Sequence, residues 1–442
     1  MKNILKIFVL VVSVVASGAF VCGCNESYIS PDYVVPADTI PYDPVREVVP
    51  VVMSMKDPAY VTLSRGMGAI AADRPTVKNN ASFYVYSFLT NNYDYSGAVD
   101  YTKTFVSEEE LPADEPMYCL IDDPETGMGA KTTLSENEVL EFAKTDIPYY
   151  YSQRYQERKY NFFAYHIDDA EVNGVVREKD NIHMNIKIDG TQDIITSVAG
   201  IKDSQLSDIN PNTEKLFLTN VLNRELVFST LTGHRFIIPV FEAKHNLSRF
   251  VFNLVGEEGM TGNGIYVQDI YAMAHRDWEL TVAADDMSKL GMKKLGEADK
   301  NGNVMDKLEP IHLCDDVGEV DGSTTGLEQY TYSVGPNEII TDLGMGLLLP
   351  PRNIYDLYIK CAYKADNGKE YKYIAHYALS NRVIADDGTV QNLPFEAGKQ
   401  YNVTIHVYGY RKIELSMDGL SWGEPIDIPI DEDDIMDFED IY

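Results

Sequence analysis

The chain has 442 residues, of which 45% are apolar, so it is long and apolar enough to bury more than one hydrophobic core. Its 69 acidic residues outnumber 37 lysines and arginines and give a formal net charge of −32. Because a nucleic-acid partner needs a basic face, this charge argues against a nucleic-acid-binding protein.

The first two dozen residues predict export. Lys2 and Lys6 precede an apolar run that ends in the small residue Gly23, and Cys24 follows. This order is typical of a secretory signal peptide, and a cysteine after the small residue resembles the bacterial lipoprotein signal, in which that cysteine carries the lipid. A transmembrane span is the alternative, but the uninterrupted apolar run is shorter than the ~20 residues that a span needs. We therefore expect residues 1–23 to be removed and Cys24 to be lipidated.

The next segment, residues 24–46, is rich in Pro and Asp and has no periodicity, so it is predicted to be an extended tether. From Val48 onward, runs of β-branched and aromatic residues with alternating polarity predict strands, and no long segment has the helical period. The clearest runs are SFYVYSFL, YNFFAYH, HMNIKI, RFVFNLV, LYIKCAY and YNVTIHVY. Frequent turn signals between such short strands make all-β sandwiches the predicted fold class.

A few short helices are expected among these strands. Residues 135–142 begin with a serine and have a glutamate three positions later, which is the capping-box signature of a helix start. Residues 214–222 and 288–295 are each predicted to hold a turn or two of helix.

A boundary near residues 241–246 divides the strand-rich part of the chain into halves of similar size. We predict an N-terminal β-sandwich domain over residues 47–240 and a C-terminal one over residues 241–424. Residues 425–442 are predicted to form a last strand with an acidic tail. In that strand Ile426, Ile428 and Ile430 alternate with other residues. A short strand with a charged end is typical of an edge or an added strand.

Motifs for catalysis, metals or cofactors are predicted to be absent. Residues 66–71 match a dinucleotide-binding string, but a proline and a strand follow where that site needs a helix. Residues 299–303 have calcium-loop residue types without the required glycine and glutamate positions. The eight histidines show no zinc-site spacing. We therefore expect no enzyme and no cofactor, although carboxylates paired only in space would leave no sequence signal.

Beyond Cys22 and Cys24, the remaining cysteines are Cys119, Cys314 and Cys361, an odd and widely spaced set that predicts no disulfide framework. Cys361 lies in an apolar strand pattern and is expected to be a buried small hydrophobe. The sequence does not decide whether Cys119 or Cys314 forms a disulfide.

Several stretches, taken in order, resemble the fimbrillin family, the lipoprotein-derived subunits of type V pili on Gram-negative anaerobes. They begin with the Cys24 signal and the Ser64-Arg65-Gly66 junction before the first long strand. Further matches are residues 160–165, 189–194, 241–250, 395–401 and 413–415, and Trp422. The resemblance spans nearly the whole mature chain. It rests on the order and spacing of these short sequences together.

The resemblance implies two tandem transthyretin-like β-sandwiches, location at the outer membrane and cell surface, and assembly with other pilin subunits head to tail. An N-terminal strand, between Val48 and Leu63 in this sequence, would fill a groove until a protease cuts after Arg65, with Arg46 as the second choice. A donor strand at residues 423–430, with Ile426, Ile428 and Ile430 as plugs, would then fill the groove of the next subunit. The physical basis is β-augmentation, in which an added strand satisfies an open sheet edge.

Alternatives remain for these roles. Arg65 is also consistent with an ordinary loop residue, and the strand at residues 426–430 with completion of its own sandwich, because alternation does not specify which sheet a strand joins. The acidic tail has no counterpart in the family pattern and would fit a tip or anchor subunit. The competing class is a surface-tethered lipoprotein that binds host glycans or a host protein, for which the 30 tyrosines would supply stacking surfaces.

Overall fold

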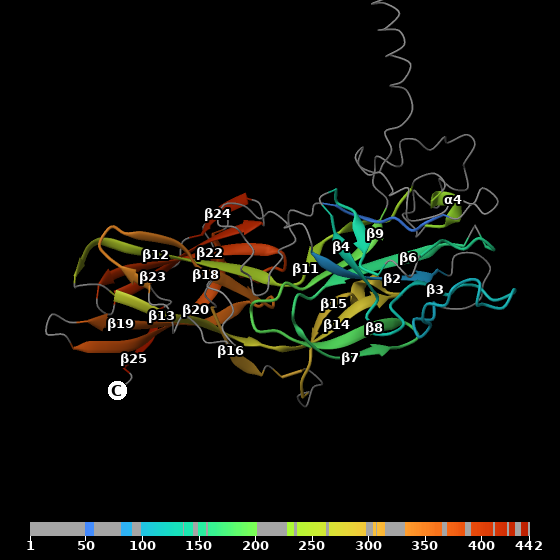
Figure 1. Cartoon of the computed structure of the whole chain (residues 1–442). Coiled ribbons are helices and arrows are strands. Elements are labelled where there is room, and N and C mark those ends of the chain that lie inside the picture. Colours follow the sequence, from blue (N-terminus) through green and yellow to red (C-terminus); the bar gives the residue numbers. More distant parts are fainter. Residues whose placement is uncertain are drawn as a thin grey trace, which may run out of the picture.

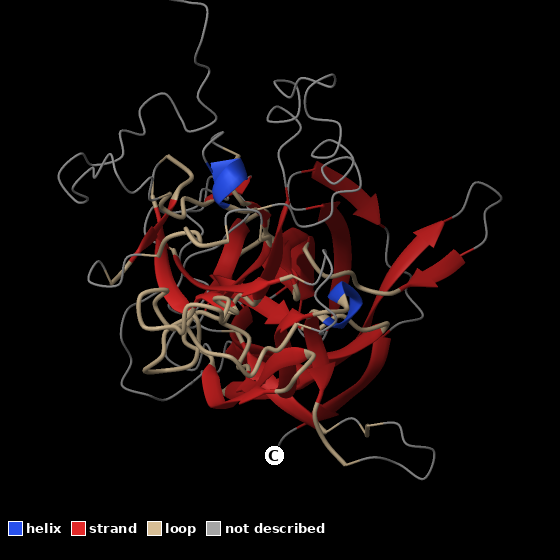
Figure 2. Ribbon diagram, turned by 90° about the vertical axis from the view of Figure 1, so that its right-hand side faces the viewer, coloured by secondary structure: helices blue, strands red, loops and turns tan. Residues whose placement is uncertain are grey.

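The structure is a computed structural model of the whole chain, and its strands form two groups that lie side by side (Figure 1). It describes residues 49–56, 81–90, 99–135, 137–144, 149–155, 158–200, 228–233, 237–261, 265–297, 304–305, 307–313, 332–364, 369–384, 390–409, 412–421, 424–428 and 435–440. Strands make up most of this part of the chain, as Figure 2 shows. The prediction of an all-β fold is confirmed, and the described part of the chain has essentially no helices. Residues 214–222, where a short helix is predicted, lie outside that part.

The first sandwich contains a nine-stranded sheet. Along its main path the strands follow the order β1 (Ser54–Lys56), β10 (Val240–Glu242), β9 (Ile195–Gly200), β6 (Tyr160–His166), β2 (Ser82–Leu89), β4 (Ala130–Leu134) and β5 (Leu140–Phe142). Two further strands, β3 (Cys119–Ile121) and β11 (Lys244–His245), pair with β2 and β9. All seven residues of β6 are buried, because hydrophobic clusters cover both faces of this sheet.

The second sheet of the first sandwich has the order β15 (Gly291–Lys294), β14 (Asp277–Ala284), β8 (Asn181–Lys187) and β7 (Glu171–Arg177). In β8 the buried residues alternate with half-buried ones, as the period of a strand with one core face requires. Its Ile182, Met184 and Ile186 pack in one cluster with Tyr86 of β2 and Phe163 of β6, so the two sheets share this core.

The second sandwich has a five-stranded and a seven-stranded sheet. The first has the order β18 (Ile339–Leu349), β12 (Ser248–Thr261), β22 (Lys399–Gly409), β23 (Lys412–Ser421) and β24 (Glu424–Ile428). The second has the order β16 (Leu308–His312), β13 (Ile265–His275), β19 (Ile354–Lys364), β20 (Glu370–Ile384) and β21 (Val390–Leu393), with β17 (Tyr332–Val334) on β13 and β25 (Ile435–Asp440) on β20. Alternate residues of β22 and β19 fill the core between the sheets.

One chain segment runs through both sandwiches. Strand β13 ends at His275 and β14 begins at Asp277, so a single residue, Arg276, separates them. Strand β13 pairs in the second sandwich and β14 pairs with β8 in the first, and Figure 1 shows β14 and β15 beside β8. The predicted domain boundary at residue 241 stays a prediction. The hairpin of β14 and β15 lies after this boundary in sequence but pairs with β8 in a sheet of the first sandwich.

The predicted helix over residues 135–142 is wrong. The chain forms a turn between β4 and β5 instead, with Glu138 at a positive φ of 61°. The Ser135 hydroxyl accepts a hydrogen bond from the Val139 N–H, so the capping-type serine stabilises a turn. Strand pairing prevails because Leu134 and Leu140 lie opposite each other and are both buried in the core. The turn predicted over residues 288–295 is a short 3-10 helix, η2 (Met287–Lys289), followed by β15.

Candidate functional site: the strand that closes the first sandwich

Residues 49–56, here called the N-terminal strand, insert a row of apolar side chains into the first sandwich. Val49 and Val51 are 6% exposed, and Met53 and Met55 are fully buried. All four belong to the cluster that covers one face of the nine-stranded sheet. The alternate residues Pro50, Val52 and Ser54 are half-buried. The segment therefore has the period of a strand with one core face.

One edge of the N-terminal strand pairs with β10. Ser54, Met55 and Lys56 lie opposite Val240, Phe241 and Glu242 in parallel register. The Ser54 N–H donates to the Pro239 carbonyl at 3.0 Å. Because β10 is joined through β9 to the rest of the sheet, this edge attaches the strand to one end of the nine-stranded order.

The other edge bonds to the opposite end of the same sheet. The Val51 N–H donates to the Tyr149 carbonyl and the Tyr151 N–H to the Val49 carbonyl, both at 3.0 Å. Nearer β5, the Leu140 N–H donates to the Met53 carbonyl at 3.1 Å and the Met55 N–H to the Glu138 carbonyl at 2.9 Å.

The N-terminal strand therefore closes the sheet on itself. Its position joins β10 to β5, the two ends of the sheet order, and gives each of these edges its hydrogen-bond partners. A closed sheet has no free edge, whereas an open one presents unpaired N–H and C=O groups to other chains. Removal of this one strand would open two edges and one apolar trough.

The trough fits its occupant closely near Val49. Gly233 ends the short helix α4 (Thr230–Gly233), and a Cβ added there would lie 2.5 Å from Cγ1 of Val49. The Tyr151 ring lies on the same side, 3.4 Å from that position. Only a glycine at position 233 leaves room for Val49, so the space here limits the size of the side chain at position 49.

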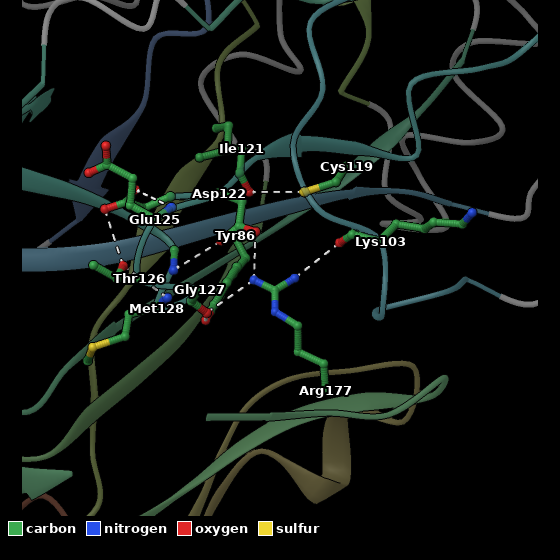
Figure 3. Close-up of polar contacts among 12 residues, drawn as sticks. Tyr86, Lys103, Cys119, Ile121, Asp122, Glu125, Thr126, Gly127, Met128 and Arg177 are labelled. Atoms are coloured by element: carbon green, nitrogen blue, oxygen red, sulfur yellow. Dashed lines mark hydrogen bonds and ion pairs between the residues drawn. The ribbon is translucent and has the colours of Figure 1, made fainter. Parts of the chain in front are cut away.

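A buried ion pair supports one wall of the trough. The Tyr149 hydroxyl donates to the Asp122 carbonyl, and Arg177 Nη2 lies 2.6 Å from Asp122 Oδ2 (Figure 3). Asp122 is fully buried. Loss of solvation raises the pKa of Asp122, and the charge of Arg177 opposes this rise. No sequence signal pointed to Asp122, Tyr149 or Arg177, because they are distant in sequence and meet only in the fold.

The predicted site residues are not brought together among the described residues. Cys24, Arg46, Arg65 and Ile430 lie outside them, so their roles stay predictions. Ile426 and Ile428 belong to β24, where they lie opposite Gly419 and Met417 of β23. The strand predicted as a donor thus pairs in its own second sandwich, which is one of the two alternatives left open by the sequence.

Tyrosines contribute to the core more than to an open binding face. Seven of them rank among the largest fully buried side chains: Tyr86, Tyr101, Tyr160, Tyr165, Tyr355, Tyr373 and Tyr401. Their rings pack against other aromatic rings, for example Phe250 on Tyr401 with centroids 5.4 Å apart. The tyrosine content therefore has a structural use that needs no ligand.

One row of rings lies on the outer face of the seven-stranded sheet. His312, Tyr271, Tyr358 and His376 lie directly opposite one another on β16, β13, β19 and β20. Neighbouring centroids are 5.0, 4.9 and 4.3 Å apart, and the last two pairs are stacked with interplanar angles of 7° and 2°. In this row the Tyr358 ring is stacked on both sides, by Tyr271 and by His376.

The described residues form no metal site. Across the described residues, no three His, Cys, Asp or Glu side chains gather to hold a metal ion. Cys361 is free and buried, as predicted, and Cys119 is free and buried as well. Cys314 and residues 66–71 and 299–303 lie outside the described part. Within that part, no helix is both long and apolar enough to cross a membrane.

No protein-family model matches the sequence. No curated protein matches it either. Solved structures do show similarity. A proposed cell adhesion protein from Bacteroides uniformis is 11% identical, with 86% of this chain and 100% of that chain covered and a TM-score of 0.41. A proposed cell adhesion protein from Bacteroides ovatus is 9% identical, with coverages of 87% and 98% and a TM-score of 0.39. The fimbrial anchor protein Mfa2 from Porphyromonas gingivalis is 10% identical, with coverages of 86% and 98% and a TM-score of 0.29.

Proposed function

We propose that this protein is a structural or adhesive subunit of a cell-surface pilus, exported as a lipoprotein through Cys24 and assembled by protease-triggered strand exchange. The observation that carries the proposal is the N-terminal strand, which closes the sheet through both of its edges. Its buried side chains Val49, Val51, Met53 and Met55 make it a plug that another strand of the same pattern could replace.

The position of the cut decides whether this plug can leave. A cut after Arg65 would separate residues 49–56 from β2, the next described strand, which begins at Ser82. The plug would then be held by non-covalent contacts alone. A cut after Arg46 would leave it attached, so Arg65 suits exchange and Arg46 does not. Each fully buried Val or Met side chain contributes roughly 1.5–3 kcal/mol, so we expect exchange to require an incoming strand rather than simple loss.

The C-terminal segment has a pattern that suits the trough. Pro50-Val51-Val52-Met53-Ser54-Met55 aligns with Pro425-Ile426-Asp427-Ile428-Pro429-Ile430, so that the first proline and the buried Val51, Met53 and Met55 coincide with Pro425 and the three isoleucines. One bond would be lost, because Pro429 has no N–H to replace the one that Ser54 donates to Pro239. A second copy of this chain is therefore the proposed donor, and such a head-to-tail contact builds a filament when it does not close on itself.

A tip or anchor subunit that does not polymerise is the second candidate. The pairing of β24 with β23 favours it, because the proposed donor residues are engaged in their own sheet. A subunit that keeps both strands would neither accept nor donate. Glycan binding by a tethered lipoprotein has less support, since seven tyrosines are among the largest fully buried side chains of the described residues.

The test is the N-terminus of the protein on the cell surface, measured by mass spectrometry of sheared material. A chain that begins at Gly66 is expected, and the Arg65→Ala variant should retain residues 24–65 and fail to form filaments. Arg46→Ala is the matched control and should assemble normally. If the wild-type chain begins at Cys24, protease-triggered exchange is refuted and an anchor or tip role is favoured.

A further inference from the structure

Tyr149 is one of the residues that bond to the N-terminal strand along the edge facing β5. Its backbone carbonyl accepts the Val51 N–H, and its ring lies 4.7 Å from the Phe142 ring and 5.0 Å from the Phe105 ring between centroids. Its hydroxyl donates to the Asp122 carbonyl. Tyr149 thus connects the edge of the N-terminal strand to Asp122, which makes no backbone hydrogen bond to that strand.

Asp122 is fixed by its own partners. Its carboxylate Oδ2 accepts a hydrogen bond from Arg177 Nη2, and its Oδ1 accepts one from the Gly129 N–H at 3.2 Å. A buried carboxylate is stable in its charged form only when such partners are present. The position of the Asp122 carbonyl, and hence of Tyr149, therefore depends on the partners of the side chain.

Arg177 holds this arrangement from the other sheet of the sandwich. It is the last residue of β7, and Figure 3 shows its guanidinium reaching Asp122 and two carbonyls. Nη2 donates to the Gly127 carbonyl and Nη1 to the Lys103 carbonyl, both at 3.1 Å. The guanidinium carbon lies 5.3 Å from the centre of the Tyr86 ring, whose hydroxyl also donates to Gly127. One side chain thus ties together three segments that are far apart in sequence.

We propose that Arg177 is a positioning residue that, through Asp122 and Tyr149, sets how often the N-terminal strand opens from its trough. The biological meaning of this role rests on the proposed function, in which that strand is exchanged. The physical reason is that the Arg177–Asp122 ion pair holds the Asp122 carbonyl, which in turn accepts the hydrogen bond from Tyr149 in the wall of the trough. Weakening it frees the Tyr149 edge while the β10 edge and the rest of the sheet keep their bonds.

The experiment measures hydrogen–deuterium exchange of residues 49–56 in the uncut full chain. Tyr149→Phe keeps the ring and removes one hydrogen bond, so we expect about fivefold faster exchange of these amides. Arg177→Met leaves a buried carboxylate without its cation, and we expect an acceleration of more than about tenfold. Arg276→Met is the matched control, because Arg276 is also partly buried but bonds to Ile188 and Glu309, away from the trough.

The amides of β6 report global opening in the same samples. Faster exchange in residues 49–56 with unchanged β6 supports the proposal. Equal acceleration in both, or wild-type rates in residues 49–56 of both variants, would overturn it. A second measurement uses the cut chain and a labelled peptide of residues 48–56. If the peptide never enters the cut wild-type chain, the proposed strand exchange fails, whereas the opening rates of the uncut variants still decide the role of Arg177.

Discussion

The N-terminal strand and β24 differ in how many of their edges are hydrogen-bonded. The N-terminal strand bonds along both edges and buries four side chains in the first sandwich. In the part of the chain that the structure describes, β24 pairs with β23 alone, at the end of the five-stranded sheet. A strand that closes a sheet cannot leave without opening two edges, while a strand added to one edge can be removed with the remaining sheet intact. The first should therefore be needed for folding and the second for assembly.

The largest expected effect is on the closing strand itself. Met53→Asp places a carboxylate in a fully buried apolar position, and we expect it to lower the free energy of unfolding by about 4 kcal/mol or more. Chemical denaturation of the uncut chain measures this. Val52→Asp is the control, because Val52 is half-buried on the opposite face and should cost much less. Equal losses in both variants would show that the N-terminal strand is not held as a plug.

The second prediction concerns the strand at the other end. Deleting residues 423–442 should leave a folded, soluble monomer with nearly unchanged stability of the first sandwich, because the deleted strands β24 and β25 both pair in the second sandwich. The same deletion should abolish filaments when the N-terminal strand has been cut off. Light scattering and electron microscopy measure assembly, and thermal unfolding measures the fold. A deleted chain that still assembles would refute the donor assignment of Ile426, Ile428 and Ile430.

The third prediction uses the close fit at Gly233. Gly233→Ala puts a Cβ 2.5 Å from Val49, and we expect a loss of about 1–3 kcal/mol in the free energy of unfolding. The double variant Gly233→Ala with Val49→Ala should recover part of this loss, since the smaller side chain relieves the clash. Gly200→Ala is the control, because an added Cβ there has no neighbour within 4 Å. A strictly additive double variant would mean that the two residues do not compete for the same space.

The smallest expected effect is a pH dependence in the first sandwich. Both ring nitrogens of buried His166 face acceptors, the Ser82 carbonyl at 2.7 Å and Asp168 Oδ1 at 3.0 Å. Burial lowers the pKa of His166, but the hydrogen bonds and charge of Asp168 outweigh burial and leave the pKa raised. Burial also raises the pKa of Asp168, so the folded pair binds its proton more tightly than the unfolded chain does.

The sign follows from these two shifts. The stabilisation from His166 is fully present below the pKa of histidine in the unfolded chain and is lost as pH rises through the raised folded value. The melting temperature of the wild-type protein should therefore fall, relative to that of His166→Gln, as pH rises above about 6.5. His376→Gln in the second sandwich is the control, because its partner Asp356 is 45% exposed and solvent screens the pair. An identical pH profile of wild type and His166→Gln would contradict the prediction.

The strand-forming segments could be predicted from local sequence patterns. The run of residues 48–53 predicts a strand but not its buried face, because Val48, Val49, Val51 and Val52 are all apolar. In residues 401–408 apolar and polar residues alternate, and Tyr401, Val403 and Ile405 are buried. The wrong helix over residues 135–142 rested on a capping signature, which is also local but weaker than the demand of paired strands for Leu134 and Leu140 in the core.

The partners of each strand and the supports of the trough could not be predicted in this way. Alternation gives a strand its face but not its neighbour, so nothing in the sequence showed that β14 leaves the second sandwich to pair with β8. In the same way, Arg177, Asp122 and Tyr149 carry no shared spacing, and Gly233 is an ordinary glycine until Val49 lies against it. These contacts join residues that are distant in sequence, and their energies exist only once the chain has brought them within a few ångströms.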